Sequence, residues 1–206
     1  MTNRKLELKQ RGKKQRKTKP VYLVIAEGRN KTETLYLSNF QKQGNNYSLR
    51  FAKAGSKTDA ESLYKTMCAK WKELELSSEK GDLGFIILDI DNDQQKADMV
   101  RNLIRKNDNM SIKFIISNPT FEIWFLIHFK YTTKHFSDGN AVINELKKYI
   151  PDYDKNRDCF LFCMDKIQDA VSNSAKINEY FVNSEWPSVE CNPRTDMGEL
   201  MSLLIE

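Results

Sequence analysis

Three aspartates stand at alternate positions after an apolar run in the segment FIILDIDND, residues 85–93. Such an uninterrupted apolar run is typical of a strand buried on both faces, as in a parallel sheet. Because successive side chains of a strand point to opposite faces, we expect Asp89 and Asp91 to project to the same side. Two carboxylates that close favour a bound divalent cation or a raised pKa. The alternative is that these acids only end the strand and begin a polar turn.

Another carboxylate, Glu27, follows a second apolar run, VYLVIA at residues 21–26. Ligands of open α/β sheets bind at the carboxyl ends of the strands, so neighbouring strands would bring Glu27 close to Asp89 and Asp91. Carboxylates of this kind suit Mg²⁺ or Mn²⁺, which can activate water and stabilise the leaving oxygen of a phosphodiester. The four cysteines form no CxxC pair and have no histidine at zinc spacing, which argues against zinc.

The elements that would position these acids alternate along the chain. Short apolar or alternating runs predict strands at residues 21–26, 47–52, 85–89 and 113–116. Amphipathic patterns predict helices at residues 33–42, 59–76 and 94–105. Strands that alternate with helices indicate βαβ units. We therefore expect an α/β fold with a parallel sheet of about four strands, flanked by helices.

The pattern changes after residue 116. The segment SNPTFEIWFLIHF, residues 117–129, predicts an Asn-Pro turn that leads into an aromatic-rich helix. Further helices are expected at residues 140–149, 164–180 and 197–204. We predict three parts: a basic flexible arm at residues 1–19, an α/β domain at 20–130, and a mainly helical C-terminal part at 131–206 that packs on it.

Positive charge is concentrated at the N-terminus. Residues 1–20 hold nine Lys and Arg and one acid, a local charge of +8, whereas the whole chain carries +5, so the rest sums to −3. Such an arm could bind the phosphate backbone of a nucleic acid, or it could only aid solubility. The residues that we expect to bind nucleic acid here are Arg4, Lys5, Arg11, Lys13, Lys14, Arg16 and Lys17.

Membrane and secreted proteins are not indicated. No apolar run approaches the roughly 20 residues of a membrane span, and the basic N-terminus lacks the apolar segment of a secretory signal. We therefore expect a cytoplasmic protein with reduced cysteines and no membrane partner.

Taken together, these motifs resemble known proteins. The Glu-Gly pair after the first strand and the Asp-x-Asp after the third resemble the Toprim fold of topoisomerases, primases and OLD-family nucleases. The longer series EGRNKTETLY, LDIDND, SNPTFEIWFLIHF and NPRT is similar to the RloB family of bacterial restriction and phage-defence loci. The resemblance covers nearly everything from Val21 onward and implies a Toprim-like sheet with a metal site.

The resemblance also implies roles for individual acids. Glu27 matches the Toprim glutamate, a metal ligand or general acid-base, and Asp89 and Asp91 match the metal-binding Asp-x-Asp pair. Glu33 resembles the second glutamate of OLD-type nucleases, although the spacing here, EGRNKTE, is longer than their EGxTE. Glu33 is therefore either a metal ligand or a first-turn acid favoured by the helix dipole. Asp93 has no counterpart, and we predict that it caps the following helix.

The aromatic segment adds one more acid. Glu122 could be a fourth carboxylate at the same sheet edge, a partner for Lys or Arg that orients the site, or a helix-start acid in solvent. His128 is either a hydrogen-bonded structural group or a group that transfers protons or contacts phosphate. Trp124, Phe125 and Phe129 are expected in the core, because their segment is apolar nearly all round.

The closing motif NPRT, residues 192–195, supplies one further basic residue. An Asn-Pro turn that opens a helix would offer free N–H groups and Arg194 to a phosphate. Alternatively, proline begins the helix and Thr195 caps it. Lys155 and Arg157 could also face a substrate, although nothing in the sequence fixes them there.

These inferences lead to one main hypothesis and two alternatives. The main hypothesis is a Mg²⁺- or Mn²⁺-dependent Toprim-type nuclease of DNA or RNA that acts in phage defence, with Glu27, Asp89, Asp91 and Glu122 as catalytic residues. Its metal ligands would be Glu27, Asp89, Asp91 and Glu33. The alternatives are a non-catalytic nucleic-acid or nucleotide binder, and a subunit that binds another defence protein such as an ATPase.

Overall fold

The computed structural model describes residues 19–27, 32–42, 44–55 and 58–205 of the 206-residue chain. In these ranges the strands are β1 (Val21–Ala26), β2 (Ser48–Phe51), β3 (Leu83–Asp89), β4 (Ile112–Asn118) and β5 (Arg194–Thr195). The α-helices are α1 (Thr32–Ser38), α2 (Ala60–Glu73), α3 (Gln94–Lys106), α4 (Glu122–Leu126), α5 (Gly139–Leu146), α6 (Phe160–Cys163), α7 (Ile167–Tyr180) and α8 (Met197–Ile205). Two short 3-10 helices are η1 (Ser78–Lys80) and η2 (Met164–Lys166).

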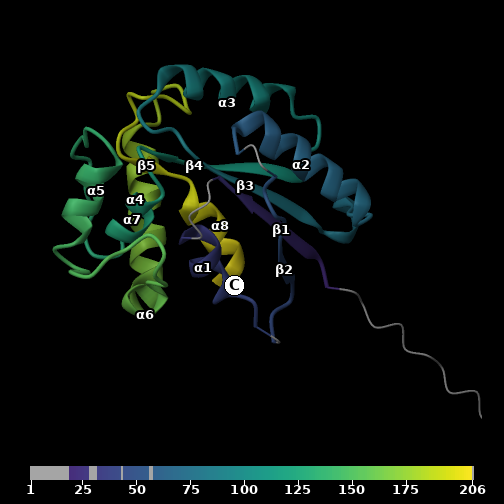
Figure 1. Cartoon of the computed structure of the whole chain (residues 1–206), viewed down its shortest axis with the longest axis horizontal. Helices are drawn as coiled ribbons and strands as arrows, with labels where there is room; N and C mark the ends of the chain where they lie inside the picture. Colours follow the sequence, from purple (N-terminus) through teal and green to yellow (C-terminus); the bar gives the residue numbers. More distant parts are fainter. Residues whose placement is uncertain (1–18, 28–31, 43, 56–57, 206) are drawn as a thin grey trace, which may run out of the picture.

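The strands form one sheet in the order β2-β1-β3-β4-β5 (Figure 1). The first four are parallel, and β5 pairs antiparallel with β4. The expected α/β fold with a parallel sheet and a C-terminal helical part is therefore confirmed. Because β1 and β3 are neighbours, with Ala26 opposite Ile87, their carboxyl ends meet at one edge of the sheet.

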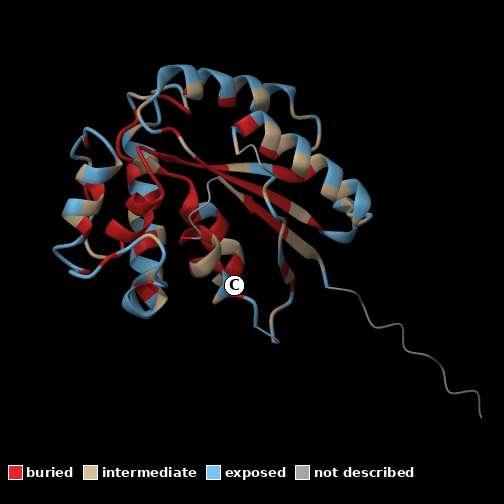
Figure 2. Ribbon diagram, viewed as in Figure 1, coloured by how far each residue is buried: buried red, intermediate tan, exposed pale blue. Residues whose placement is uncertain are grey.

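Helices cover both faces of the sheet. α2 and α3 lie over one face, where Leu63 and Val100 pack on Ile25 and Ile86. On the other face, α1, α4 and α8 lie with α5, α6 and α7 farther out (Figure 1). The central strands β3 and β4 are largely buried, while the outer surfaces of the helices are exposed (Figure 2). No helix in the described ranges is long and apolar enough to cross a membrane.

The aspartate segment does not continue as a strand. β3 ends at Asp89, and both Asp91 and Asn92 adopt a left-handed conformation with φ of 56°. We expected strand alternation to place Asp89 and Asp91 on the same side. That reason was wrong, because Asp91 lies in a turn after the strand and the turn sets the direction of its side chain. As predicted, Asp93 caps α3: its Oδ1 accepts hydrogen bonds from the backbone N–H groups of Gln95 and Lys96.

The closing motif also differs from the prediction. Arg194 and Thr195 form β5, paired with Asn118 and Ser117, so the Asn-Pro pair does not open a helix. Proline does not begin α8 either. Thr195 lies in β5, two residues before the helix, and its Oγ1 accepts a 3.2 Å hydrogen bond from the N–H of Met197, the first residue of α8. The aromatic-rich helix predicted after the Asn-Pro turn in residues 117–129 is short, because only the five residues of α4 are α-helical.

Candidate metal centre

The predicted acids share a small cavity at the carboxyl ends of β1 and β3. Its volume is about 170 Å³, and α1 and α4 complete its wall. The lining residues are Glu27, Thr32, Glu33, Asp89, Asp91, Phe121, Glu122 and Lys155. All five carboxylates that the sequence singles out as catalytic or metal-binding therefore lie around one space, which we call the acidic cavity.

Glu27 and Asp91 share a single ammonium group. Lys96, in the first turn of α3, donates 2.8 Å hydrogen bonds to Glu27 Oε1 and to Asp91 Oδ2. The other oxygen of Glu27, Oε2, accepts a 3.3 Å hydrogen bond from the N–H of Asp89. Burial lowers the pKa of Lys96, but its hydrogen bonds to the two carboxylates outweigh this and raise the pKa above its usual value. Lys96 is therefore a fixed positive charge beside the cavity.

The negative charge of Asp89 is much less compensated than that of Glu27 or Asp91, because no ion pair in the described residues involves Asp89. Its Oδ2 accepts a hydrogen bond from Thr120 Oγ1 at 3.1 Å, whereas its enclosed Oδ1 has no hydrogen-bond partner among the described residues. Burial, followed by the nearby charges of Glu33, Glu122 and Asp91, holds the pKa of Asp89 well above its usual range. A bound cation or a proton would compensate the charge of this carboxylate.

Glu33 is in a similar state. It stands in the first turn of α1, as one interpretation held, but it is only 8% exposed and lines the acidic cavity. Within the described part of the chain its buried Oε2 has no hydrogen-bond partner. Burial is the largest of the causes that raise the pKa of Glu33 to about 7. The structure thus places Glu33 with the other acids despite the longer spacing.

Glu122 is the most enclosed of the five acids, and both of its oxygens have hydrogen-bond partners. It is 1% exposed, so the solvent-facing alternative was wrong. Its Oε1 accepts a 2.8 Å hydrogen bond from the hydroxyl of Tyr153 and lies 3.2 Å from Lys155 Nζ. The two remaining alternatives both hold, because Glu122 is a fourth acid at this edge and also a partner for a lysine.

Thr120 connects two of the carboxylates. Its hydroxyl lies 2.6 Å from Glu122 Oε2 and 3.1 Å from Asp89 Oδ2, with geometry suitable for donation to either. One hydroxyl carries a single proton, so both contacts are satisfied only when one of the two acids is protonated. This is consistent with the raised pKa of Asp89.

The oxygen donors of the acidic cavity suit a hard divalent cation. The distances between the carboxylates in this structure, however, are longer than a bound cation requires. The donors are carboxylates, and the two unpartnered oxygens belong to Glu33 and Asp89. In the part of the chain that the structure describes, however, no three Asp, Glu, His or Cys side chains approach closely enough to enclose a metal ion. Ion pairs with Lys96 and Lys155 hold three of the acids, so a cation would have to draw the oxygens together.

Sequence reasoning missed several residues that shape the cavity. Lys96 carried one usable signal. Side chains in a helix tilt toward its N-terminus, so a lysine three residues after the cap is directed back toward the strand ends. Tyr153 and Thr120 gave no such signal. Lys155 was noted as a basic residue without a fixed place, and the structure gives it one at Glu122.

The remaining predicted residues lie elsewhere. His128 is buried: its Nδ1 lies 2.8 Å from the carbonyl oxygen of Trp124, and burial lowers the pKa of His128 to about 4, so the structural interpretation is favoured. Trp124 and Phe125 are in the core, and Phe129 packs against it, as expected. The guanidinium of Arg194 lies 4.4 Å from the ring centre of Trp186. Arg4, Lys5, Arg11, Lys13, Lys14, Arg16 and Lys17 lie outside the described residues.

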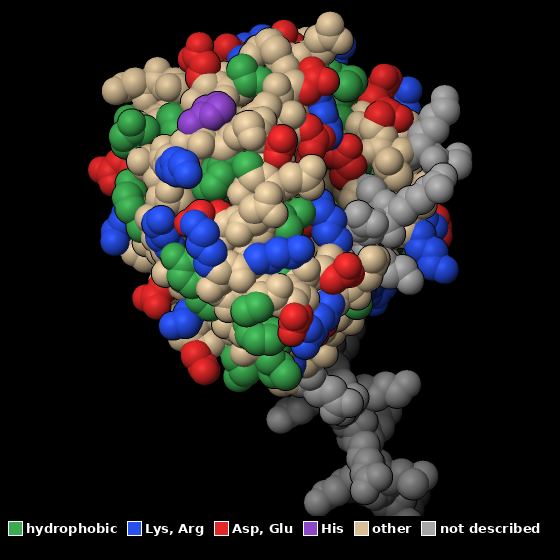
Figure 3. Space-filling model, turned by 60° about the vertical axis from the view of Figure 1, so that its left-hand side comes forward, with side chains coloured by type: hydrophobic (Ala, Val, Ile, Leu, Met, Phe, Trp, Pro, Cys, Tyr) green, Lys and Arg blue, Asp and Glu red, His purple; other side chains and the backbone are tan. Residues whose placement is uncertain are grey.

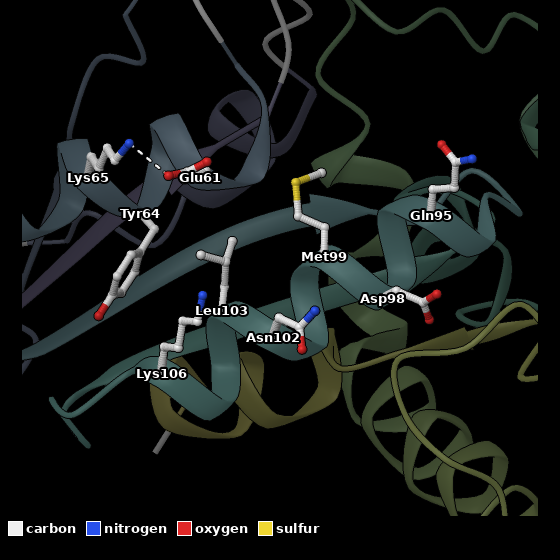
Figure 4. A pocket seen from close by; sticks show the side chains of 9 residues that line it. All are labelled: Glu61, Tyr64, Lys65, Gln95, Asp98, Met99, Asn102, Leu103 and Lys106. Atoms are coloured by element: carbon white, nitrogen blue, oxygen red, sulfur yellow. Dashed lines mark ion pairs between the residues drawn. The ribbon is translucent and has the colours of Figure 1, made fainter.

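A larger cavity of about 660 Å³ lies between α2 and α3 (Figure 4). Tyr64, Met99 and Leu103 line it together with charged side chains, among them the 2.8 Å ion pair of Glu61 and Lys65. None of the five clustered carboxylates lines it. We place the candidate site at the acidic cavity despite its smaller volume, because the uncompensated carboxylates are there.

Comparison with known proteins agrees with the sequence motifs. The family model described as RloB-like protein matches residues 22–204, which is nearly the whole chain. The search of curated proteins and the search of solved structures gave no significant match. The matched segment contains every acid of the cavity together with Lys96, Tyr153 and Lys155. The chain therefore belongs to the RloB-like protein family.

Proposed function

We propose that this protein is a Mg²⁺- or Mn²⁺-dependent nuclease of the Toprim type, which cleaves phosphodiester bonds of DNA or RNA in the cytoplasm as part of phage defence. The observation that carries the proposal is the acidic cavity, in which two buried carboxylate oxygens, Glu33 Oε2 and Asp89 Oδ1, have no hydrogen-bond partner among the described residues. Uncompensated carboxylates are unfavourable for folding and are typical of functional sites.

The residues of the cavity would divide the work. Glu27, Asp89 and Asp91, with Glu33 as a further acid, would hold the metal ion, and Glu27 would otherwise act as a general acid-base. A divalent ion bound there would polarise a phosphoryl oxygen and lower the pKa of its bound water. Glu122 would be held in place by Tyr153 and Lys155, whose ammonium, 3.2 Å from the carboxylate, faces the same cavity.

The partners follow from charge. The face in Figure 3 carries acidic side chains gathered in its upper half and Lys and Arg side chains across its middle. The nine basic residues of positions 1–20 would add sequence-independent attraction to a polyanion. A second defence protein, such as an ATPase, would be a further partner that activates the site.

A non-catalytic role is the second candidate. Lys96 and Lys155 already neutralise part of the acidic cavity, which would suit a binder of nucleic acid or nucleotide, or a subunit that binds another defence protein. In that case the acids would recognise a ligand without hydrolysing it.

Cleavage assays separate the two candidates. The full chain is incubated with end-labelled single- and double-stranded DNA and RNA, with Mg²⁺, Mn²⁺ or EDTA. We expect metal-dependent cleavage that Asp89→Asn abolishes and that Asp152→Asn, at an exposed aspartate outside the cavity, leaves intact. Tight binding without cleavage of all four substrates, under both metals, would refute the nuclease and favour the non-catalytic binder.

A further inference from the structure

Lys96 pairs with two of the five acids of the acidic cavity, Glu27 and Asp91, and we call this pair the outer half of the cavity. In the outer half, Glu27 and Asp91 both accept hydrogen bonds from Lys96 Nζ at 2.8 Å. One ammonium therefore neutralises and connects two carboxylates, as a metal ion that bridges them would. The outer half is compensated by the chain itself.

The inner half is formed by Glu33 and Asp89. Neither acid forms an ion pair within the described ranges, because Lys155, which lines the same cavity, pairs with Glu122. Glu33 is 92% buried, lines the cavity and presents an Oε2 with no hydrogen-bond partner in the described ranges. Asp89 likewise presents an enclosed, unpartnered Oδ1. Burial and the like charges of neighbouring carboxylates raise the pKa of both Glu33 and Asp89. The demand for an added cation is therefore at Glu33 and Asp89.

Lys96 is well held in its position. Its side chain is 16% exposed, and its backbone N–H is bound by the α3 cap, Asp93 Oδ1, at 3.1 Å. To vacate the outer half, the ammonium would lose two charge-assisted hydrogen bonds, each stronger than a neutral one. A dication that entered beside an ammonium still in place would meet like charge at short range.

We propose that the Lys96 ammonium takes the place of a second metal ion, so that the acidic cavity binds a single divalent cation, held by Glu33 and Asp89. This inference rests on the metal site of the proposed function, specifies its stoichiometry and narrows its ligands to Glu33 and Asp89, with Glu27 and Asp91 held by Lys96. Lys96 is a positioning residue for Glu27 and Asp91.

The test is the number of Mn²⁺ ions bound by the full chain, measured by titration calorimetry and by the loss of the free-Mn²⁺ electron paramagnetic resonance signal. We expect one ion per chain for the natural protein and for Lys96→Arg, which keeps the charge. Lys96→Met removes the charge at similar length, and we expect it to bind two ions. Lys148→Met removes an ion-paired lysine whose side chain is 65% exposed and serves as the matched control with one ion.

The outcomes distinguish the two proposals. Two ions in the natural protein, or one ion in a folded Lys96→Met, would overturn this inference and leave metal-dependent cleavage possible. No bound ion in any variant would overturn both proposals. If Lys96→Met does not fold, the number of anomalous Mn²⁺ peaks in crystals of the natural protein decides: one peak beside Glu33 and Asp89 supports the inference, and a second peak beside Glu27 and Asp91 refutes it.

Discussion

The hydroxyl of Tyr153 donates a 2.8 Å hydrogen bond to Oε1 of Glu122, across 31 residues of sequence. Both side chains are buried, with 5% and 1% exposure. Burial and the neighbouring Glu122 carboxylate raise the pKa of Tyr153, so the phenol remains a donor at any physiological pH. The loop after α5 thus fixes the most enclosed acid of the cavity.

Replacing Tyr153 by phenylalanine should lower the free energy of unfolding by about 1–3 kcal/mol, because Glu122 would lose one of its donors while staying buried. Urea denaturation measures this difference. Tyr131→Phe, at a tyrosine that is 45% exposed, is the matched control and should change stability very little. Equal losses in both variants would show that the hydrogen bond contributes nothing.

Glu33 predicts a pH dependence of stability. Its pKa is raised from 4.5 to about 7 in the folded protein, so the folded state binds the proton more tightly than the unfolded state. The contribution of Glu33 to stability is therefore most favourable below about pH 4.5 and is lost as the pH rises through 7. By this linkage the ionised carboxylate costs up to about 3 kcal/mol at pH 8.

Glu33→Gln should remove that loss, so that the variant is more stable than the natural protein at pH 8 and equal to it near pH 4.5. Urea denaturation in EDTA between these pH values provides the comparison, with the exposed Glu179→Gln as control. Parallel pH profiles for Glu33→Gln and the natural protein would contradict the prediction.

Close packing of α7 and α8 depends on Gly198. A Cβ at this position would lie 2.7 Å from Cβ and Oγ of Ser174, closer than side-chain carbons tolerate. Gly198→Ala should therefore destabilise the protein by roughly 1–2 kcal/mol, despite the better helix propensity of alanine. Thermal unfolding reports the change. Adding Ser174→Gly should restore part of it, and Gly55→Ala, with open space around the added methyl group, should have little effect.

The cap of α3 supports both the helix and the first-turn lysine. Asp93→Ala should cost about 1 kcal/mol through the loss of the N-cap, whereas Asp93→Asn should retain most of the stability. If Lys96 depends on this cap, Asp93→Ala should also alter the affinity for Mn²⁺ measured by calorimetry. Unchanged stability in Asp93→Ala would refute the assignment of the cap.

The basic arm predicts a salt effect. Deleting residues 1–19 removes nine Lys and Arg, so affinity for nucleic acid should fall and its dependence on salt concentration should become shallower. Fluorescence anisotropy over a range of salt concentrations measures both quantities. Identical salt slopes for the full and shortened chains would reduce the arm to a solubility tail.

The sheet and the acids were accessible to sequence reasoning because they obey local rules. The apolar run of β3 predicts a buried strand, and an acid directly after such a strand lies at the edge where ligands bind. Asp93 was predictable as a cap for the same reason, since capping depends on neighbouring backbone alone.

Other features depend on contacts that no local pattern encodes. β5 has only two residues and pairs with a strand far back in the chain, so neither length nor alternation marks it. Tyr153 reaches Glu122 only through the path of the loop after α5. The left-handed turn at Asp91 was missed because an alternating Asp-x-Asp pattern looks like a continuing strand.

The pairing of β5 with β4 has a consequence for biosynthesis. Ser117 and Thr195, whose hydroxyls lie 2.9 Å apart, are separated by 78 residues. At about 5–20 residues per second, the nascent chain would carry β4 as an uncovered sheet edge for roughly 4–16 s before its partner emerges from the ribosome. Open edges invite pairing with other chains. The last strand therefore covers the β4 edge only at the end of synthesis. A chain that terminates before residue 194 would be released with that edge exposed.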